Sequence, residues 1–194
     1  MGNIFQRGAF QSYKVQSLNE AMGNVSTLYH KDQAKKITVF LSHKHDDLDD
    51  LKGVIGFLER QYDVKVYIDS RDDSMPQITS GETAERIKKR IMQCEKFILL
   101  ATDGAIESKW CNWELGYGDA MKFASNNIAL FPMKDKGKTD SGYKGNEYME
   151  IYPHIVYRDG STTYKTGKKV SAGYYLRYKE DNEYKLKPLE AWLS

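Results

Sequence analysis

Cysteine is scarce in this chain of 194 residues, and the two that are present, Cys94 and Cys111, match no paired disulfide or metal-binding spacing. This usage favours a reduced compartment, and we expect a cytoplasmic protein. Long apolar runs are also missing, since FILLA (97–101) is far shorter than the roughly 20 residues of a membrane helix. The first residues, MGNIFQRGAF, lack the apolar core of a secretory signal. We therefore expect no membrane partner.

The sequence lacks a strong excess of charge of either sign. Lys and Arg together number 29 and Asp and Glu number 27, which leaves a net charge of +2. Acidic residues are interspersed among the lysines of the C-terminal segment, a pattern typical of a solvated surface. We expect no nucleic-acid partner, because such proteins usually carry a concentrated basic patch. His43 and His45 lie close in the sequence without an evident third ligand, so no metal site is predicted.

Short apolar segments alternate with amphipathic ones through most of the chain. Helical spacing of apolar residues predicts a helix over about 47–62, and Thr79 and Ser108 have the chemistry of helix N-caps for two more. Runs rich in β-branched, aliphatic and aromatic residues predict five strands, at 36–42, 64–69, 96–102, 127–133 and 151–157. This alternation predicts an α/β fold with a parallel sheet, because parallel strands need helical crossovers.

Two segments flank this pattern. Residues 1–35 are polar and lack sustained periodicity, so we interpret them as an N-terminal extension, with one short helix near 18–22. Residues 158–194 form a tyrosine-rich C-terminal extension that we expect to pack on the domain or complete it. A hairpin turning at Gly167 and a final short helix over 188–193 are predicted there.

The segment SKWCNWELG (108–116) holds one carboxylate, Glu114, among large apolar residues. Burying an unpaired carboxylate costs several kcal/mol. Glu114 is therefore either a solvated helix residue or the lining of a cleft. Trp110 precedes it by four residues and shares its helix face. Ligands of parallel α/β sheets bind at the carboxyl ends of the strands, where this helix would begin.

Four segments in this order resemble a Toll/interleukin-1 receptor (TIR) domain. They are ITVFLSHKHDD (37–47), VYIDSRDDSMPQITSGE (66–82), CEKFILLATDGAIESKWCNWELG (94–116) and NIALFPM (127–133). The Trp–Cys–Glu helix is the specific part. The resemblance covers 36–157, which we take as the domain, and implies a flavodoxin-like three-layer sandwich around a five-stranded parallel sheet.

The resemblance also implies an activity, because many TIR domains cleave NAD⁺ at the nicotinamide–ribose bond. The glutamate responsible aligns with Glu114. The aligned positions that would contact the substrate are Ser42, His43, Lys44, Asp69, Ser70, Trp110 and Cys111. NAD⁺ would be the substrate, and no cofactor is implied. Lys44 would act as a point charge where the family often has arginine. Asp69 and Ser70 either contact ribose or cap a turn, and Cys111 could equally be core packing.

The chemistry is compatible with a single carboxylate. Glycoside cleavage passes through an oxocarbenium-like centre that a nearby carboxylate stabilises. The leaving group of NAD⁺ is already a cationic pyridinium, so no general acid is needed to expel it.

Three functions stay open. A short TIR protein resembles bacterial anti-phage components of the Thoeris type, in which a cyclic or conjugated ADP-ribose signals to a separate effector protein. Plain hydrolysis of NAD⁺ to ADP-ribose and nicotinamide is the first alternative. The second is a non-catalytic scaffold that self-associates through the BB loop, residues 69–81. Members of the family that are enzymes also use this loop to complete a neighbour's site.

Overall fold

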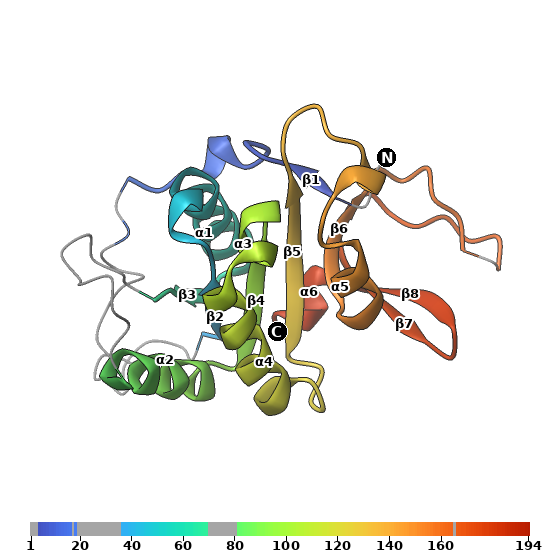
Figure 1. Cartoon of the computed structure of the whole chain (residues 1–194). Helices are drawn as coiled ribbons and strands as arrows, with labels where there is room; N and C mark the ends of the chain where they lie inside the picture. Colours follow the sequence, from blue (N-terminus) through green and yellow to red (C-terminus); the bar gives the residue numbers. More distant parts are fainter. Residues whose placement is uncertain (1–3, 17, 19–35, 70–80, 165) are drawn as a thin grey trace.

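The computed structural model describes residues 4–16, 18, 36–69, 81–164 and 166–194. Five parallel strands form its central sheet in the order β3-β2-β4-β5-β6 (Figure 1). Their bounds are β2 Thr38–Ser42, β3 Lys65–Tyr67, β4 Lys96–Ala101, β5 Ile128–Lys134 and β6 His154–Arg158. The predicted α/β class and the five-stranded parallel sheet are confirmed, and the strand order is that of flavodoxin-like folds.

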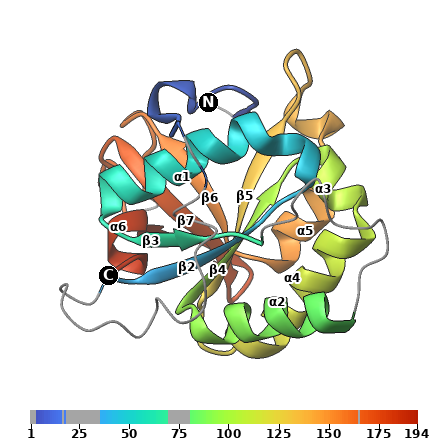
Figure 2. The same cartoon turned by 90° about the vertical axis from the view of Figure 1, so that its left-hand side faces the viewer.

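Helices cover both faces of this sheet and make a three-layer sandwich (Figures 1 and 2). On one face, α1 (Leu48–Tyr62) and α6 (Leu189–Trp192) pack over a core that includes Leu41, Phe131 and Trp192. The other face is covered by α2 (Gly81–Gln93), α3 (Asp103–Glu107), α4 (Lys109–Lys122) and α5 (Asn146–Ile151). The strands are apolar on both faces because both faces are buried. None of the helices in the described part of the chain is long and apolar enough to cross a membrane.

The C-terminal extension lengthens the sheet beyond β6. Strands β7 (Gly173–Glu180) and β8 (Glu183–Pro188) add two antiparallel neighbours, and α6 ends the chain as predicted. The hairpin between them turns at Asp181 and Asn182, both in the left-handed region (φ 50° and 61°). The chain also turns at Gly167 as predicted, since the Gly167 amide donates to the Tyr164 carbonyl at 2.9 Å and Thr163 forms an antiparallel bridge with Lys169, but the long strands of the extension are joined at the later turn.

The N-terminal extension also joins the fold where it is described. Strand β1 (Phe5–Gln6) pairs in parallel with the end of β5, and the 3₁₀ turn η1 (Gln11–Tyr13) lies on α1. Two glycines permit this contact. A Cβ atom added at Gly53 would lie 2.7 Å from the Phe10 carbonyl oxygen, and one added at Gly56 would lie 1.8 Å from the Tyr13 carbonyl oxygen.

The domain boundaries predicted at 35/36 and 157/158 stay predictions. Both flanks contribute to the core of the central sheet, with Phe10 from one side and Leu176 and Trp192 from the other. The predicted helix near 18–22 lies outside the described residues from residue 19 on, and so does the Thr79 cap. Two further 3₁₀ turns, η3 (His45–Asp47) and η4 (Asp140–Gly142), occupy loops that follow β2 and β5.

A histidine on β6 makes the stability of this fold depend on pH. His154 is fully buried, and burial, aided by the charges of Arg177 and Arg158, lowers its pKa to about 4. Its ring nitrogens face the Tyr152 carbonyl and the Arg177 guanidinium, each at 3.4 Å. The folded chain thus holds a neutral imidazole well below the ordinary value of 6.5.

We expect acid to destabilise the protein through His154. Between about pH 6.5 and pH 4 the unfolded chain binds this proton and the folded chain does not, so the free energy of unfolding falls as pH falls. From pH 7.5 to pH 5 the wild type should lose about 2 kcal/mol more than a His154→Gln variant. Urea unfolding at the two pH values measures this difference. Equal losses in the two proteins would contradict it.

Candidate active site

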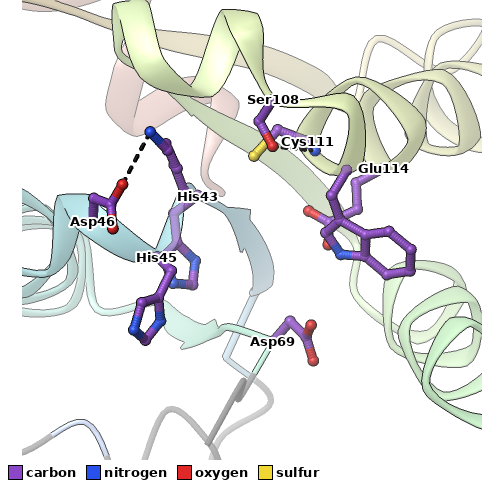
Figure 3. A pocket seen from close by; sticks show the side chains of 9 residues that line it. His43, His45, Asp46, Asp69, Ser108, Cys111 and Glu114 are labelled. Atoms are coloured by element: carbon purple, nitrogen blue, oxygen red, sulfur yellow. Dashed lines mark hydrogen bonds and ion pairs between the residues drawn. The ribbon is translucent and has the colours of Figure 1, made fainter. Parts of the chain in front are cut away.

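A cavity of about 270 Å³ opens at the carboxyl ends of β2 and β3, beside the first turns of α4 (Figure 3). Three segments of the chain contribute its walls. They are the loop after β2, the end of the segment after β3, and the start of α4. The lining residues are His43, Lys44, His45, Asp46, Asp69, Ser108, Trp110, Cys111 and Glu114.

The position of α4 is set by its start and by its contact with the sheet. Ser108 is the N-cap, and its hydroxyl accepts a hydrogen bond from the Cys111 amide at 3.3 Å. This arrangement satisfies one of the unpaired donors of the first turn. Further along the helix, Gly118 lies against the ring of Phe97 on β4, where a Cβ atom would approach to 2.9 Å. Cys111 and Leu115 are buried on the side that faces the sheet.

Glu114 is a buried carboxylate at the edge of this packed side. Its side chain is 2% exposed, and its Oε2 accepts a short hydrogen bond from the hydroxyl of Ser42, the last residue of β2. A hydrogen bond to a charged group contributes about 1.5–3 kcal/mol, which offsets part of the burial cost. Glu114 also lines the cavity, so a ligand there would meet a carboxylate held in place by the sheet.

The indole of Trp110 is held by other aromatic rings. It stacks on Trp113 with centroids 4.7 Å apart, and Trp113 stacks on Tyr117 at 6.3 Å. The ammonium of Lys88 on α2 lies 5.9 Å and 5.7 Å from the centroids of Trp113 and Tyr117. Cation–π contacts of this kind contribute about 0.5–1 kcal/mol when exposed. These stacked rings hold Trp110 in place where it lines the cavity.

The opposite wall is the loop after β2. Lys44 pairs with Asp46 at 3.0 Å, and the hydrogen bond from Lys44 lowers the pKa of Asp46 while raising that of Lys44 (Figure 3). The side chain of Lys44 also lies over Gly104 of α3, where a Cβ atom would be 3.0 Å from its Cδ. Within the described ranges, no group of three or more His, Cys, Asp or Glu side chains could hold a metal ion.

Behind this loop, Asp47 connects several segments. It is 1% exposed, accepts a hydrogen bond from Thr102 Oγ1 at 2.6 Å, and pairs with Arg7 Nη1 at 2.8 Å. Burial raises the pKa of Asp47 although both partners act to lower it. The same Thr102 hydroxyl caps α3 by accepting from the Ala105 amide.

Most of the residues implied by the resemblance come together here. The cavity is lined by six of them, His43, Lys44, Asp69, Trp110, Cys111 and Glu114. Ser42 donates a hydrogen bond to Glu114. Ser70 lies outside the described residues, as do residues 70–80 of the BB loop. His45, Asp46 and Ser108 line the cavity without having been predicted as site residues. Their place after β2 and before α4 is the available signal, because those loops lie at the carboxyl edge of the sheet.

Comparison with known proteins identifies the family of the domain. A family model described as TIR domain matches residues 39–163. The chain therefore belongs to the TIR domain family. Over 89 residues, 44% of its length, it is 33% identical to a Cytobacillus dafuensis protein named putative cyclic ADP-D-ribose synthase TIR2. That alignment spans 23% of the length of the relative.

The Ser42 hydroxyl should matter for stability because it serves a buried carboxylate. We expect Ser42→Ala to lower the free energy of unfolding by about 1–3 kcal/mol, since Glu114 loses this donor. Urea unfolding measures the change. Ser161→Ala is the control, because the Ser161 hydroxyl donates to Asp159 on the exposed surface and its loss should cost under about 0.5 kcal/mol. Similar small effects for both variants would count against a strong Ser42–Glu114 interaction.

Proposed function

We propose that this TIR domain cleaves NAD⁺ at the bond between nicotinamide and ribose, with Glu114 as the catalytic carboxylate. The observation that carries the proposal is the burial of Glu114 at a cavity wall, where Ser42 holds one of its oxygens. Membership of the TIR family supports it. A solvated Glu114 would not support the proposal, because water would screen its charge from any bound sugar.

The cleaved bond leaves a ribose carbon with cationic character. A carboxylate in a water-poor cavity stabilises such a centre more strongly than one in bulk solvent. Because Glu114 is already fixed by Ser42, little reorganisation is needed as positive charge develops. The departing pyridinium becomes neutral nicotinamide, so the protein need not supply a proton to it. NAD⁺ is thus the substrate, and the proposal includes no resident cofactor.

The size of the cavity indicates which part of NAD⁺ it would take. Pockets that enclose a drug-sized ligand measure about 300–1,000 Å³, and this one measures about 270 Å³. It suits the nicotinamide and its ribose better than a whole dinucleotide. The diphosphate and adenosine would then extend beyond it, with Lys44 of the cavity wall as a nearby positive charge.

The proposal extends to the fate of the ADP-ribose part. A cyclic or conjugated product would form if a group of the same nucleotide or a second acceptor attacks the ribose, and plain ADP-ribose would form if water does. The name of the C. dafuensis relative favours the cyclic product. Such a product would act as a signal to a separate effector protein in anti-phage defence.

The test is nicotinamide release by purified protein, followed by liquid chromatography. We expect Glu114→Gln to lose activity by about 10²–10³-fold, the usual effect of removing one preorganised electrostatic contact. The amide oxygen still accepts from Ser42, so this variant should fold. Glu107→Gln is the matched control, because Glu107 is 61% exposed on α3 and pairs with Lys144. Mass spectrometry of the second product separates cyclisation, conjugation and hydrolysis.

Two results would overturn the proposal. Full activity in Glu114→Gln would remove the carboxylate from the reaction. No nicotinamide from wild-type protein at any concentration would leave the scaffold function, in which the domain works through contacts between TIR domains.

Self-association through residues 69–81 is a further part of the proposal. If a neighbouring subunit completes the site, activity per subunit should rise with protein concentration. Initial rates measured beside sedimentation velocity test this. A constant rate per subunit in a strictly monomeric protein would contradict it.

A further inference from the structure

The N-terminal strap, defined as residues 4–16, lies outside the part of the chain that matches the TIR family, 39–163. It is nevertheless packed into the domain. Ile4 and Phe10 are 7% and 3% exposed, and the Arg7 amide donates to the Lys134 carbonyl at the end of β5. Figure 2 shows the strap crossing above α1. A segment so fixed can influence what lies beside it.

Arg7 is the charged contact of the strap with the interior. Its guanidinium pairs with Asp47 and with Asp50, in both cases at 2.8 Å. These carboxylates are 1% and 5% exposed, whereas Arg7 is 31% exposed. The Gly8 amide also donates to Asp50 at 2.7 Å. One arginine from outside the matched domain therefore neutralises two buried acids inside it.

Asp47 links this arginine to both walls of the cavity. It ends the turn η3, whose first residues, His45 and Asp46, line the cavity, and its amide donates to the Lys44 carbonyl. Its other link is the hydroxyl of Thr102, which caps α3. Helix α3 leads directly to Ser108 and thus to the helix of Glu114. A continuous series of contacts therefore connects the strap with the loop after β2 and with the start of α4.

We propose that Arg7 is a positioning residue for the candidate active site, acting through Asp47 to hold the loop 43–46 opposite Glu114. The effect on catalysis rests on the proposed function, whereas the effect on the loop does not. Without Arg7, Asp50 keeps the Gly8 amide as a donor and Asp47 keeps the Thr102 hydroxyl. Both carboxylates lose the guanidinium. A buried carboxylate deprived of its counter-charge either takes up a proton or turns toward water. Either response moves η3.

The experiment compares Arg7→Ala with Lys14→Ala. Lys14 is a matched control because it belongs to the same strap and pairs with Asp49 of the same helix, but both partners are exposed and neither contacts the cavity. The chain has four histidines, His30, His43, His45 and His154. Their imidazole resonances give a readout by nuclear magnetic resonance that needs no enzymatic activity, and the buried His154 on β6 serves as an internal reference.

We expect Arg7→Ala to shift the resonances of His43 and His45 and to leave that of His154 in place. For NAD⁺ cleavage, kcat should fall by about 10–100-fold with a smaller change in KM, because small displacements of catalytic groups act on the chemical step. Lys14→Ala should stay within about twofold of wild type in both parameters, as expected for an exposed pair.

A second variant separates positioning from a general loss of structure. In Arg7→Ala/Asp47→Asn the buried charge at position 47 is gone, and the oxygen of the new side-chain amide can still accept from Thr102, while Asp50 keeps the Gly8 amide. This double variant should recover the His43 and His45 resonances and part of kcat. Arg7→Lys should recover less, since an ammonium cannot bond to both carboxylates with the fork of a guanidinium. If Arg7→Ala fails to fold, these two variants carry the comparison.

Unmoved His43 and His45 resonances in Arg7→Ala would overturn the proposal, as would moved resonances with kcat unchanged. Failure of the proposed function is distinguishable from both. In that case wild type and Glu114→Gln would release nicotinamide equally or not at all, and the resonances alone would decide whether Arg7 positions the loop.

Discussion

The need of a buried carboxylate for donors organises the carboxyl edge of this sheet. Asp47, Asp50 and Glu114 are each no more than 5% exposed. Their donors come from different parts of the chain: Arg7 and Gly8 from the strap, Ser42 from β2, and Thr102 from the residue that follows β4. Because an ionised group in the interior is costly until it is paired, these contacts tie distant segments to one another. The cavity is lined by Glu114 and by residues of the turn that Asp47 ends, so the pairing of these acids helps to define its walls.

Elements with strong local patterns could be predicted from the sequence. The five parallel strands, α1, the Ser108 cap and α6 were all visible as apolar runs, helical spacing or capping residues. The short helices α3 and α5 were missed, because five or six residues offer too little periodicity. The turn at Gly167 could be predicted from its glycine, whereas the β7–β8 hairpin could not, because its turn uses Asp181 and Asn182, which give a weaker turn signal.

Some features of the candidate site could likewise be predicted from the sequence, and others could not. Glu114, Trp110 and the loop after β2 could be found because the TIR resemblance is strongest there, and the edge rule for parallel sheets points to the same loops. The pairing of Arg7 with Asp47 could not be found, since it joins residues 40 positions apart and leaves no local pattern. The burial of Glu114 was undecided from sequence alone, because a helix glutamate next to tryptophans fits a solvated face equally well. The packing of Cys111 and Leu115 against the sheet is what turns it inward.

The hairpin at the end of the chain bears on how copies of the domain could meet. Strand β8 is the outermost strand of the extended sheet, and it carries Lys185, Lys187 and Pro188. Lysine and proline on an outer strand discourage another chain from adding to the ladder of backbone hydrogen bonds. Continuous growth of the sheet into an amyloid-like ribbon is therefore disfavoured at this side. Two copies that met at this side would therefore touch through side chains rather than through shared backbone pairing.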